Sequence, residues 1–188
     1  MDLHTSTERS PSDFPPGTPV IYAMHGKCFV LGTEVRSLGG KTQKFYKLEM
    51  KKSPLSRAAK GESAIWVPVE QARERGLRAP MSPEEAESAM KLLMSREYFF
   101  KISEPWTTLL SQLENVVRTE GGLGLAKAAS FLYVLKRKQI VATPEVNKLL
   151  ESVNKLLFRE LSEALGTTIK SIEDRIARGL RSKLLPDH

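Results

Sequence analysis

The stretch GLRAPMSPEEAESAMKLL, residues 76–93, marks the point where the chain changes from one kind of secondary structure to another. Within it, Ser82 is followed by Pro83 and, three residues after the serine, by Glu85, which is the capping-box pattern of a helix N-terminus. Residues beyond this point follow a helical period, whereas the runs before it are short and rich in strand-forming residues. The stretch therefore predicts a β domain on its N-terminal side and a helical domain on its C-terminal side.

Upstream, four short runs are β-branched, aromatic or alternating in polarity, as strands are: VIYA (20–23), CFVLGTEV (28–35), KFYKLEM (44–50) and AIWVPV (64–69). The dipeptides HG and GG and a polar stretch at 51–63 separate them, and we expect this last stretch to form a protruding basic loop. Four or five strands of this length predict a small antiparallel β-barrel, because a closed sheet has no exposed edge.

Downstream, the helical period continues almost to the C-terminus. TPEVNKLLESVNKLLFRELSEAL (143–165) begins with a Thr–Pro cap pair and carries one apolar stripe. Helices are also expected at 104–119 and 125–139, with the glycine-rich EGGLG between them, and apolar residues at four-residue spacing indicate a last helix. The second half therefore predicts a bundle of about five helices, and the fold class expected for the whole chain is α+β.

These patterns divide the chain into four parts. Residues 1–13 are rich in Ser, Thr, Asp and Pro, and we expect them to form a flexible tail. The β domain is expected at 14–72, a linker at 73–81 and the helical domain at 82–184.

Composition excludes several classes of protein. No apolar run approaches the roughly 20 residues of a membrane span, and the N-terminus lacks the apolar region of a secretory signal. Cys28 is the only cysteine, which excludes an internal disulfide and fits a reducing compartment. We therefore expect a cytoplasmic protein that does not act at a membrane.

The net charge of +7 makes a polyanionic partner plausible. Between Arg36 and Lys60 there are eight basic residues, and only Glu49 opposes them. The same lysines could simply keep strand edges and a loop solvated, so basicity alone leaves both interpretations open.

The sequence offers little for catalysis. His25 and Cys28 are close enough to suggest a metal pair or a nucleophile with its base, but a zinc site needs about four ligands and no second cluster is present. GGLGLAK (121–127) lacks the Gly-Lys-Ser/Thr ending of a phosphate-binding loop. We expect no metal, no cofactor and no enzymatic activity.

Trp106 has two interpretations. With Ser103 as N-cap it lies in the first turn of a helix, and it starts an apolar stripe made of Leu109, Leu110, Leu113, Val116 and Val117. The ring could be buried with that stripe. It could also extend past the end of the bundle, where free N–H groups together with Lys101 and Arg96 would suit a phosphate and the ring could wedge into a base step.

Several segments, taken in order, resemble the CarD/CdnL family of bacterial transcription regulators, whose N-terminal module is shared with the transcription-repair coupling factor. The resemblance extends from about Pro16 to Leu165 and is carried by GTPVIYAMHGK…GTEV, QKFYKLEM, WVPV, GLRAPMSPEEAESAMKLL, EPWTTLLSQLENV, ASFLYVLKRK and NKLLFRELSEAL. It implies a Tudor/SH3-like barrel that docks on the β subunit of RNA polymerase. By position, the implied contacts are Arg36, Tyr46, Lys47, Trp66 and Pro68, although Trp66 could instead belong to the barrel core.

The resemblance also implies that the helical domain reaches promoter DNA at the upstream edge of the melted bubble, where Trp106 would stabilise the open complex of a monomeric regulator. Family members usually carry basic residues after this tryptophan, whereas this chain has TTLLSQ, so Lys101, Arg118 and Lys127 are the expected phosphate contacts. One alternative is an adaptor whose helical domain binds another protein. Another is a general nucleic-acid module that uses the basic loop.

Overall fold

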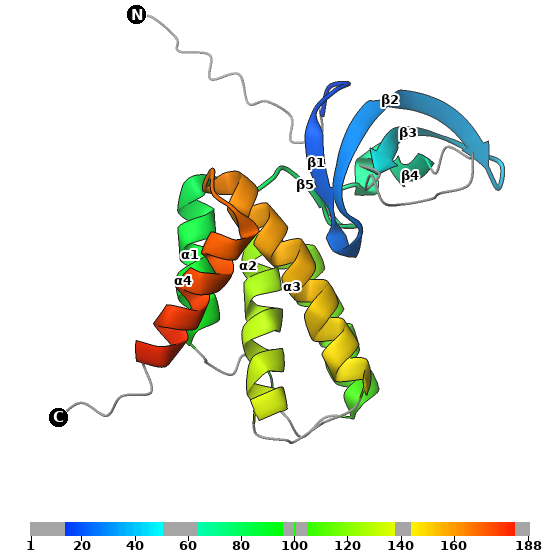
Figure 1. Ribbon diagram of the computed structural model, residues 1–188. Helices are drawn as coiled ribbons and strands as arrows, with labels where there is room; N and C mark the ends of the chain where they lie inside the picture. The colour runs from blue at the N-terminus through cyan, green and yellow to red at the C-terminus, as the bar shows by residue number, and fades with distance from the viewer. Residues whose placement is uncertain (1–13, 51–63, 96–99, 101–104, 138–143, 183–188) are drawn as a thin grey trace, which may run out of the picture.

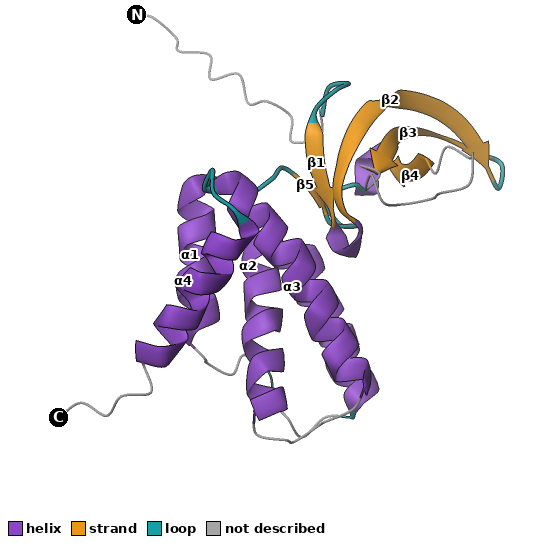
Figure 2. Cartoon of the chain, in the orientation of Figure 1, coloured by secondary structure: helices purple, strands orange, loops and turns teal. Residues whose placement is uncertain are grey.

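The computed structural model describes residues 14–50, 64–95, 100, 105–137 and 144–182. It is an α+β protein in which a β-sheet forms the N-terminal half and helices form the C-terminal half (Figure 1). The strands and the α-helices occupy separate regions that lie side by side, and only short 3-10 helices lie among the strands (Figure 2). The tail at 1–13 and the basic loop at 51–63 fall outside the described residues.

The sheet contains five antiparallel strands in the order β4-β3-β2-β1-β5. Their bounds are β1 Pro19–Tyr22, β2 Gly26–Leu38, β3 Lys41–Met50, β4 Ala64–Pro68 and β5 Leu77–Arg78. Two short 3-10 helices join them, η1 (Ala23–His25) after β1 and η2 (Val69–Gln71) after β4.

The predicted barrel does not close. Strands β4 and β5 are the two edges of the sheet, and no pairing joins them among the described residues. After β4 the chain passes through η2 and Ala72, which is buried in the sheet core, and then forms only two residues of β5 beside β1. The core is thus covered by a turn of helix at the place where a closed barrel would need another strand.

One face of the sheet carries its own hydrophobic core, made of Val20, Cys28, Val30, Tyr46, Leu48, Val67, Ala72 and Leu77. The alternation of side chains along each strand sends the neighbouring residues to the outer face. A register shift between Val30 and Gly32 inserts Leu31 as an extra residue in β2, and such bulges bend a strand.

The helices are α1 Pro83–Ser95, α2 Trp106–Arg137, α3 Pro144–Ala164 and α4 Ile169–Ser182. The capping box predicted for α1 is present: the Glu85 N–H donates to Ser82 Oγ at 3.2 Å, and the Ser82 N–H donates to Glu85 Oε2 at 2.8 Å. Four helices are found in the described residues where about five were predicted, because the two helices expected on either side of EGGLG form the single element α2.

Helix α2 is interrupted at Gly121, whose φ of 59° and ψ of −126° are not helical. A Cβ built at Gly124 would lie 2.3 Å from the carbonyl oxygen of Val116. In a continuous helix these residues would be about 12 Å apart along the axis. The chain therefore reverses at Gly121, and α2 consists of two arms packed against each other at the turn.

The helices enclose a second, larger core that is separate from the sheet core. Phe131, Leu132 and Leu135 of α2 and Leu157 and Leu161 of α3 are fully buried in it. No helix among the described residues is long and apolar enough to cross a membrane.

Candidate docking surface on the sheet

Trp66 lies at the centre of a cluster on the outer face of the sheet. Strand pairing sets Lys47 of β3 directly beside it, and β2 contributes Arg36 from the next strand. The Arg36 guanidinium carbon is 3.7 Å from the centroid of the indole, and the Lys47 amine is 5.4 Å from the same ring. Each cation over an exposed aromatic ring contributes about 0.5–1 kcal/mol, so two positive groups interact with the indole.

Glu34 completes this cluster. Its carboxylate lies 3.9 Å from Arg36 Nε and 3.9 Å from Lys47 Nζ, and all three side chains are partly exposed to solvent. Pairs this long and this exposed contribute little to stability. The cluster of Glu34, Arg36, Lys47 and Trp66 therefore keeps an excess of one positive charge, and its aromatic ring stays accessible.

The alternation of β4 explains why Trp66 is outside the core. Val67 is fully buried, and Ile65 also packs against the sheet core, so Trp66 between them faces the other way. Of the two interpretations of Trp66, the structure supports surface contact, because the side chain is half-buried and is not part of the sheet core.

Two of the predicted contact residues are buried. Tyr46 is 1% exposed, and its hydroxyl accepts a hydrogen bond of 3.3 Å from the Phe14 N–H. It is one step from Lys47 along β3 and so faces the core, and its contact with a polymerase stays a prediction. Pro68 is buried at the end of β4, where it pairs with Phe45.

The cluster lies beside an open strand edge. Strand β4 pairs with β3 on one side, and no described strand pairs with its other side. An unpaired edge presents backbone N–H and C=O groups to which an extended segment of a partner can bond as an added strand. The arrangement thus combines main-chain bonding groups with an aromatic and cationic patch that can select the partner.

Comparison with protein families identifies this part of the chain. Residues 14–80 match the family model of the CarD-like/TRCF RID domain. Residues 14–80, called the RID domain below, are similar to this family. The match confirms the resemblance for these residues only, and it ends three residues before α1 begins. A comparison with curated protein sequences finds no significant match.

In the helical domain, the structure describes three of the residues predicted to contact DNA: Trp106, Arg118 and Lys127. It does not bring Trp106 and Arg118 together. Trp106 is the first residue of α2, and its half-buried side chain packs against the helical core. Arg118 lies at the other end of the same arm, about 18 Å away at about 1.5 Å per residue. Lys101, together with Arg96 and the expected N-cap Ser103, lies outside the described residues.

Arg118 and Lys127 already have partners within the protein. Arg118 donates to the carbonyl oxygen of Glu74 in the RID domain and to Asn115 Oδ1, each at 2.6 Å. Lys127, across the turn of α2, forms an ion pair with Glu120. Arg118 therefore joins the RID domain to the helices, which is a structural role that sequence reasoning missed.

A second link between the two domains is buried. The Arg78 guanidinium of β5 donates two hydrogen bonds, of 2.6 and 2.8 Å, to the carboxylate of Glu160 in α3. The Met81 N–H donates a third bond of 2.9 Å to the same carboxylate, which is almost completely shielded from solvent. No local pattern could have predicted this pair, because its members are 82 positions apart in the chain.

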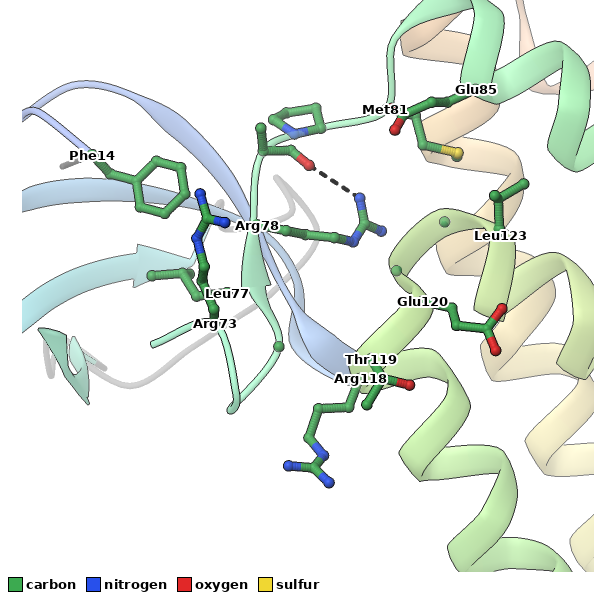
Figure 3. A pocket seen from close by; sticks show the side chains of 15 residues that line it. Phe14, Arg73, Leu77, Arg78, Met81, Glu85, Arg118, Thr119, Glu120 and Leu123 are labelled. Carbon is green, nitrogen blue, oxygen red and sulfur yellow. Dashed lines mark hydrogen bonds between the residues drawn. The ribbon is translucent and has the colours of Figure 1, made fainter. Parts of the chain in front are cut away.

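A pocket of about 420 Å³ lies at this junction. Arg78 extends across it from the RID domain toward the turn of α2 and also donates to the Ala79 carbonyl at 3.1 Å (Figure 3). Arg73 and Phe14 lie on the sheet side of the same pocket, and Glu120 lies on the helical side (Figure 3).

His25 and Cys28 do not form a reactive pair. The His25 ring stacks on Tyr22 with centroids 5.0 Å apart, while the Cys28 thiol is buried and donates to the Gly26 carbonyl at 3.6 Å. Burial raises the pKa of the Cys28 thiol, which keeps it protonated and unreactive. Among the described residues, no group of three His, Cys, Asp or Glu side chains could hold a metal ion.

Proposed function

We propose that this protein is a transcription regulator that docks on the β subunit of RNA polymerase through its RID domain and catalyses no chemical step. The observation that carries the proposal is the cluster in which Arg36 and Lys47 both approach the Trp66 ring, within a domain matching a polymerase-interacting family. Such a protein acts where the polymerase is, in the cytoplasm and on the nucleoid.

Docking combines two kinds of contact. An extended segment of the polymerase adds to the free edge of β4, and main-chain hydrogen bonds supply most of the affinity. Trp66 supplies a rigid aromatic contact next to that edge, and large aromatic side chains of this kind often dominate the binding energy of an interface. Arg36 and Lys47 favour an acidic segment over a basic one.

We further propose that the helical domain then contacts promoter DNA at the upstream edge of the bubble. Trp106 is the residue that would make the decisive contact, because it is at the start of α2 and is only half-buried. A contact made only in the melted state shifts the equilibrium toward that state. A difference of about 1.4 kcal/mol would shift it about tenfold.

A second candidate function is an adaptor that docks on the polymerase and uses its helices to bind another protein. The observation that favours it is the state of the expected phosphate contacts: Arg118 is bound to Glu74, Lys127 is paired with Glu120, and Trp106 packs against the helical core. In this case Trp106→Ala would destabilise the bundle without a specific effect on DNA.

Docking is tested by measuring the binding of the full chain to RNA polymerase core enzyme. Trp66→Ala is expected to weaken binding at least tenfold and to leave the melting temperature unchanged, because Trp66 is outside the sheet core. Arg178→Glu, at an exposed position of α4, is the matched control for a surface change. Wild-type affinity in Trp66→Ala would refute the docking proposal.

The DNA contact is tested separately by the lifetime of the open promoter complex with Trp106→Ala. A protein that melts normally, binds polymerase normally and no longer extends the lifetime would support the DNA contact. A variant that still extends the lifetime would exclude the contact and favour the adaptor.

A further inference from the structure

The β2–β3 hairpin continues past the rest of the sheet as a two-stranded ribbon. Strand β3 pairs with β4 only from Phe45 onward, so residues 41–44 are flanked by β2 alone. We call residues 35–44 the distal ribbon. Every one of its residues is exposed, and Figure 1 shows its turn at the end of the sheet away from the helices.

The ribbon has a fixed geometry. Its turn consists of Gly39 and Gly40, with φ of 59° and 79°, and positive φ at both central residues is what a two-residue hairpin turn requires. Pairing continues without interruption from Val35 opposite Lys44 to Leu38 opposite Lys41. The ribbon therefore extends as a defined element of two strands, with its side chains in known register.

Two aliphatic side chains of the ribbon are unusually exposed. Val35 is 68% exposed and Leu38 is 63% exposed, although both are in regular strand structure. An isolated pair of strands gains no stability from a core, and exposed aliphatic groups on it contribute nothing to folding. Both side chains are therefore available for contact with another molecule.

The charge of the ribbon indicates what that molecule is. Residues 35–44 contain Arg36, Lys41 and Lys44 and no acidic residue. Among the described residues, Lys41 and Lys44 form no ion pair. The partner is therefore expected to be strongly negative.

The arrangement of charge on the two faces of the ribbon distinguishes between two candidate partners, a nucleic acid and an acidic protein surface. Cross-strand pairing places Lys44 with Val35 on one face and Lys41 with Leu38 on the other. A partner protein lying against the ribbon would meet one face and leave the other lysine unused. A groove of duplex DNA has a phosphate backbone on each of its two walls, so it can contact both faces of the ribbon.

We propose that the distal ribbon binds duplex DNA by entering the major groove. That groove is about 12 Å wide and admits a two-stranded ribbon, whose strands are about 4.8 Å apart. Lys41 and Lys44 contact phosphates on opposite walls, and Leu38 at the tip contacts base edges such as a thymine methyl group. This binding needs neither polymerase nor Trp106, so it goes beyond the function proposed above.

The test is the binding of the full chain to a fluorescently labelled duplex, followed by anisotropy without polymerase between about 50 and 200 mM salt. Lys41→Gln/Lys44→Gln is compared with wild type and with Lys91→Gln/Lys148→Gln, a control pair at exposed positions of α1 and α3. Each lost phosphate contact reduces the slope of log K against log salt by about 0.9. The ribbon pair should therefore reduce it by about 1.8, so that the fourfold rise in salt weakens wild type about twelvefold more than the variant.

Leu38→Ser probes the contact that does not depend on charge, and it should raise Kd several-fold without changing the slope. The proposal is overturned if the ribbon pair leaves the slope unchanged, or if the control pair lowers it as much. It is also overturned if the ribbon pair affects binding to polyglutamate but not to the duplex, since the ribbon would then bind an acidic protein segment. These binding measurements contain no polymerase, so they do not depend on whether Trp66→Ala weakens docking.

Discussion

The buried link between Arg78 and Glu160 predicts how strongly the RID domain is coupled to the helices. Arg78→Ala would leave the Glu160 carboxylate shielded from solvent with only the Met81 N–H as a partner. Breaking a buried pair in this way costs about 3–5 kcal/mol, because an uncompensated charge remains. The Arg78 side chain is 21% exposed to solvent. We therefore expect a cost at the lower end of this range, about 3 kcal/mol.

For a chain of this size, each kcal/mol lowers the melting temperature by about 2–4 °C, so Arg78→Ala should melt about 6–12 °C lower. The lost contact between Arg78 and Glu160 lies at the junction between two separate cores. We therefore also expect Arg78→Ala to split a single unfolding transition into two. Replacing both members, as Arg78→Met/Glu160→Met, should recover at least half of the loss, since no unpaired charge is left.

The assay is urea unfolding followed by far-ultraviolet circular dichroism, with thermal melts in parallel. Arg175→Ala is the matched control, because Arg175 and Glu87 form a similar two-bond pair of 2.6 and 2.8 Å on the surface. Both of its side chains are more than a third exposed, and its loss should cost less than about 1 kcal/mol. If Arg78→Ala costs no more than Arg175→Ala, the buried link does not hold the two domains together.

Two further predictions concern the helices. Gly124→Ala would place a Cβ 2.3 Å from the Val116 carbonyl oxygen, where backbone cannot move aside cheaply, so the variant should lose about 1–3 kcal/mol in urea unfolding; wild-type stability would show that the arms of α2 are not in contact. Hydrogen bonding to Arg175 holds the pKa of Glu87 below its usual value of 4.5, so this carboxylate stabilises the fold above about pH 4.5 and ceases to do so as the pH falls through its lowered pKa. Glu87→Gln should therefore melt slightly below wild type at pH 6 and equally with it near pH 2; a difference that persists at pH 2 would contradict this assignment.

The contacts between the RID domain and the helices connect docking at Trp66 with the position of the helical domain. Arg78, Arg118 and Lys27 each bond from one domain to the other, the last through an ion pair with Glu163. The links come from three different segments and hold the helices against the sheet. A partner bound at Trp66 would therefore set where the start of α2 lies.

Local patterns were enough to establish the fold class and most element boundaries. Ser82, Pro83 and Glu85 predicted the start of α1, and Pro144 predicted that of α3, because caps and first-turn residues act within four positions of one another. Alternation predicted the first four strands for the same reason. The location of Arg36, Lys47 and Trp66 on neighbouring strands was likewise within reach of the sequence, through its family resemblance.

Tertiary packing decided what the local patterns left open. Tyr46 and Lys47 are adjacent and equally compatible with a strand, and only the side on which the core forms makes one of them buried and the other a surface residue. The reversal at Gly121 depends on how closely two arms can approach, and the open sheet depends on Ala72 covering the core. The pairing of Arg78 with Glu160 arises because burial of a charge is tolerated only where distant segments bring its partner, and contacts of that kind leave no signal in nearby residues.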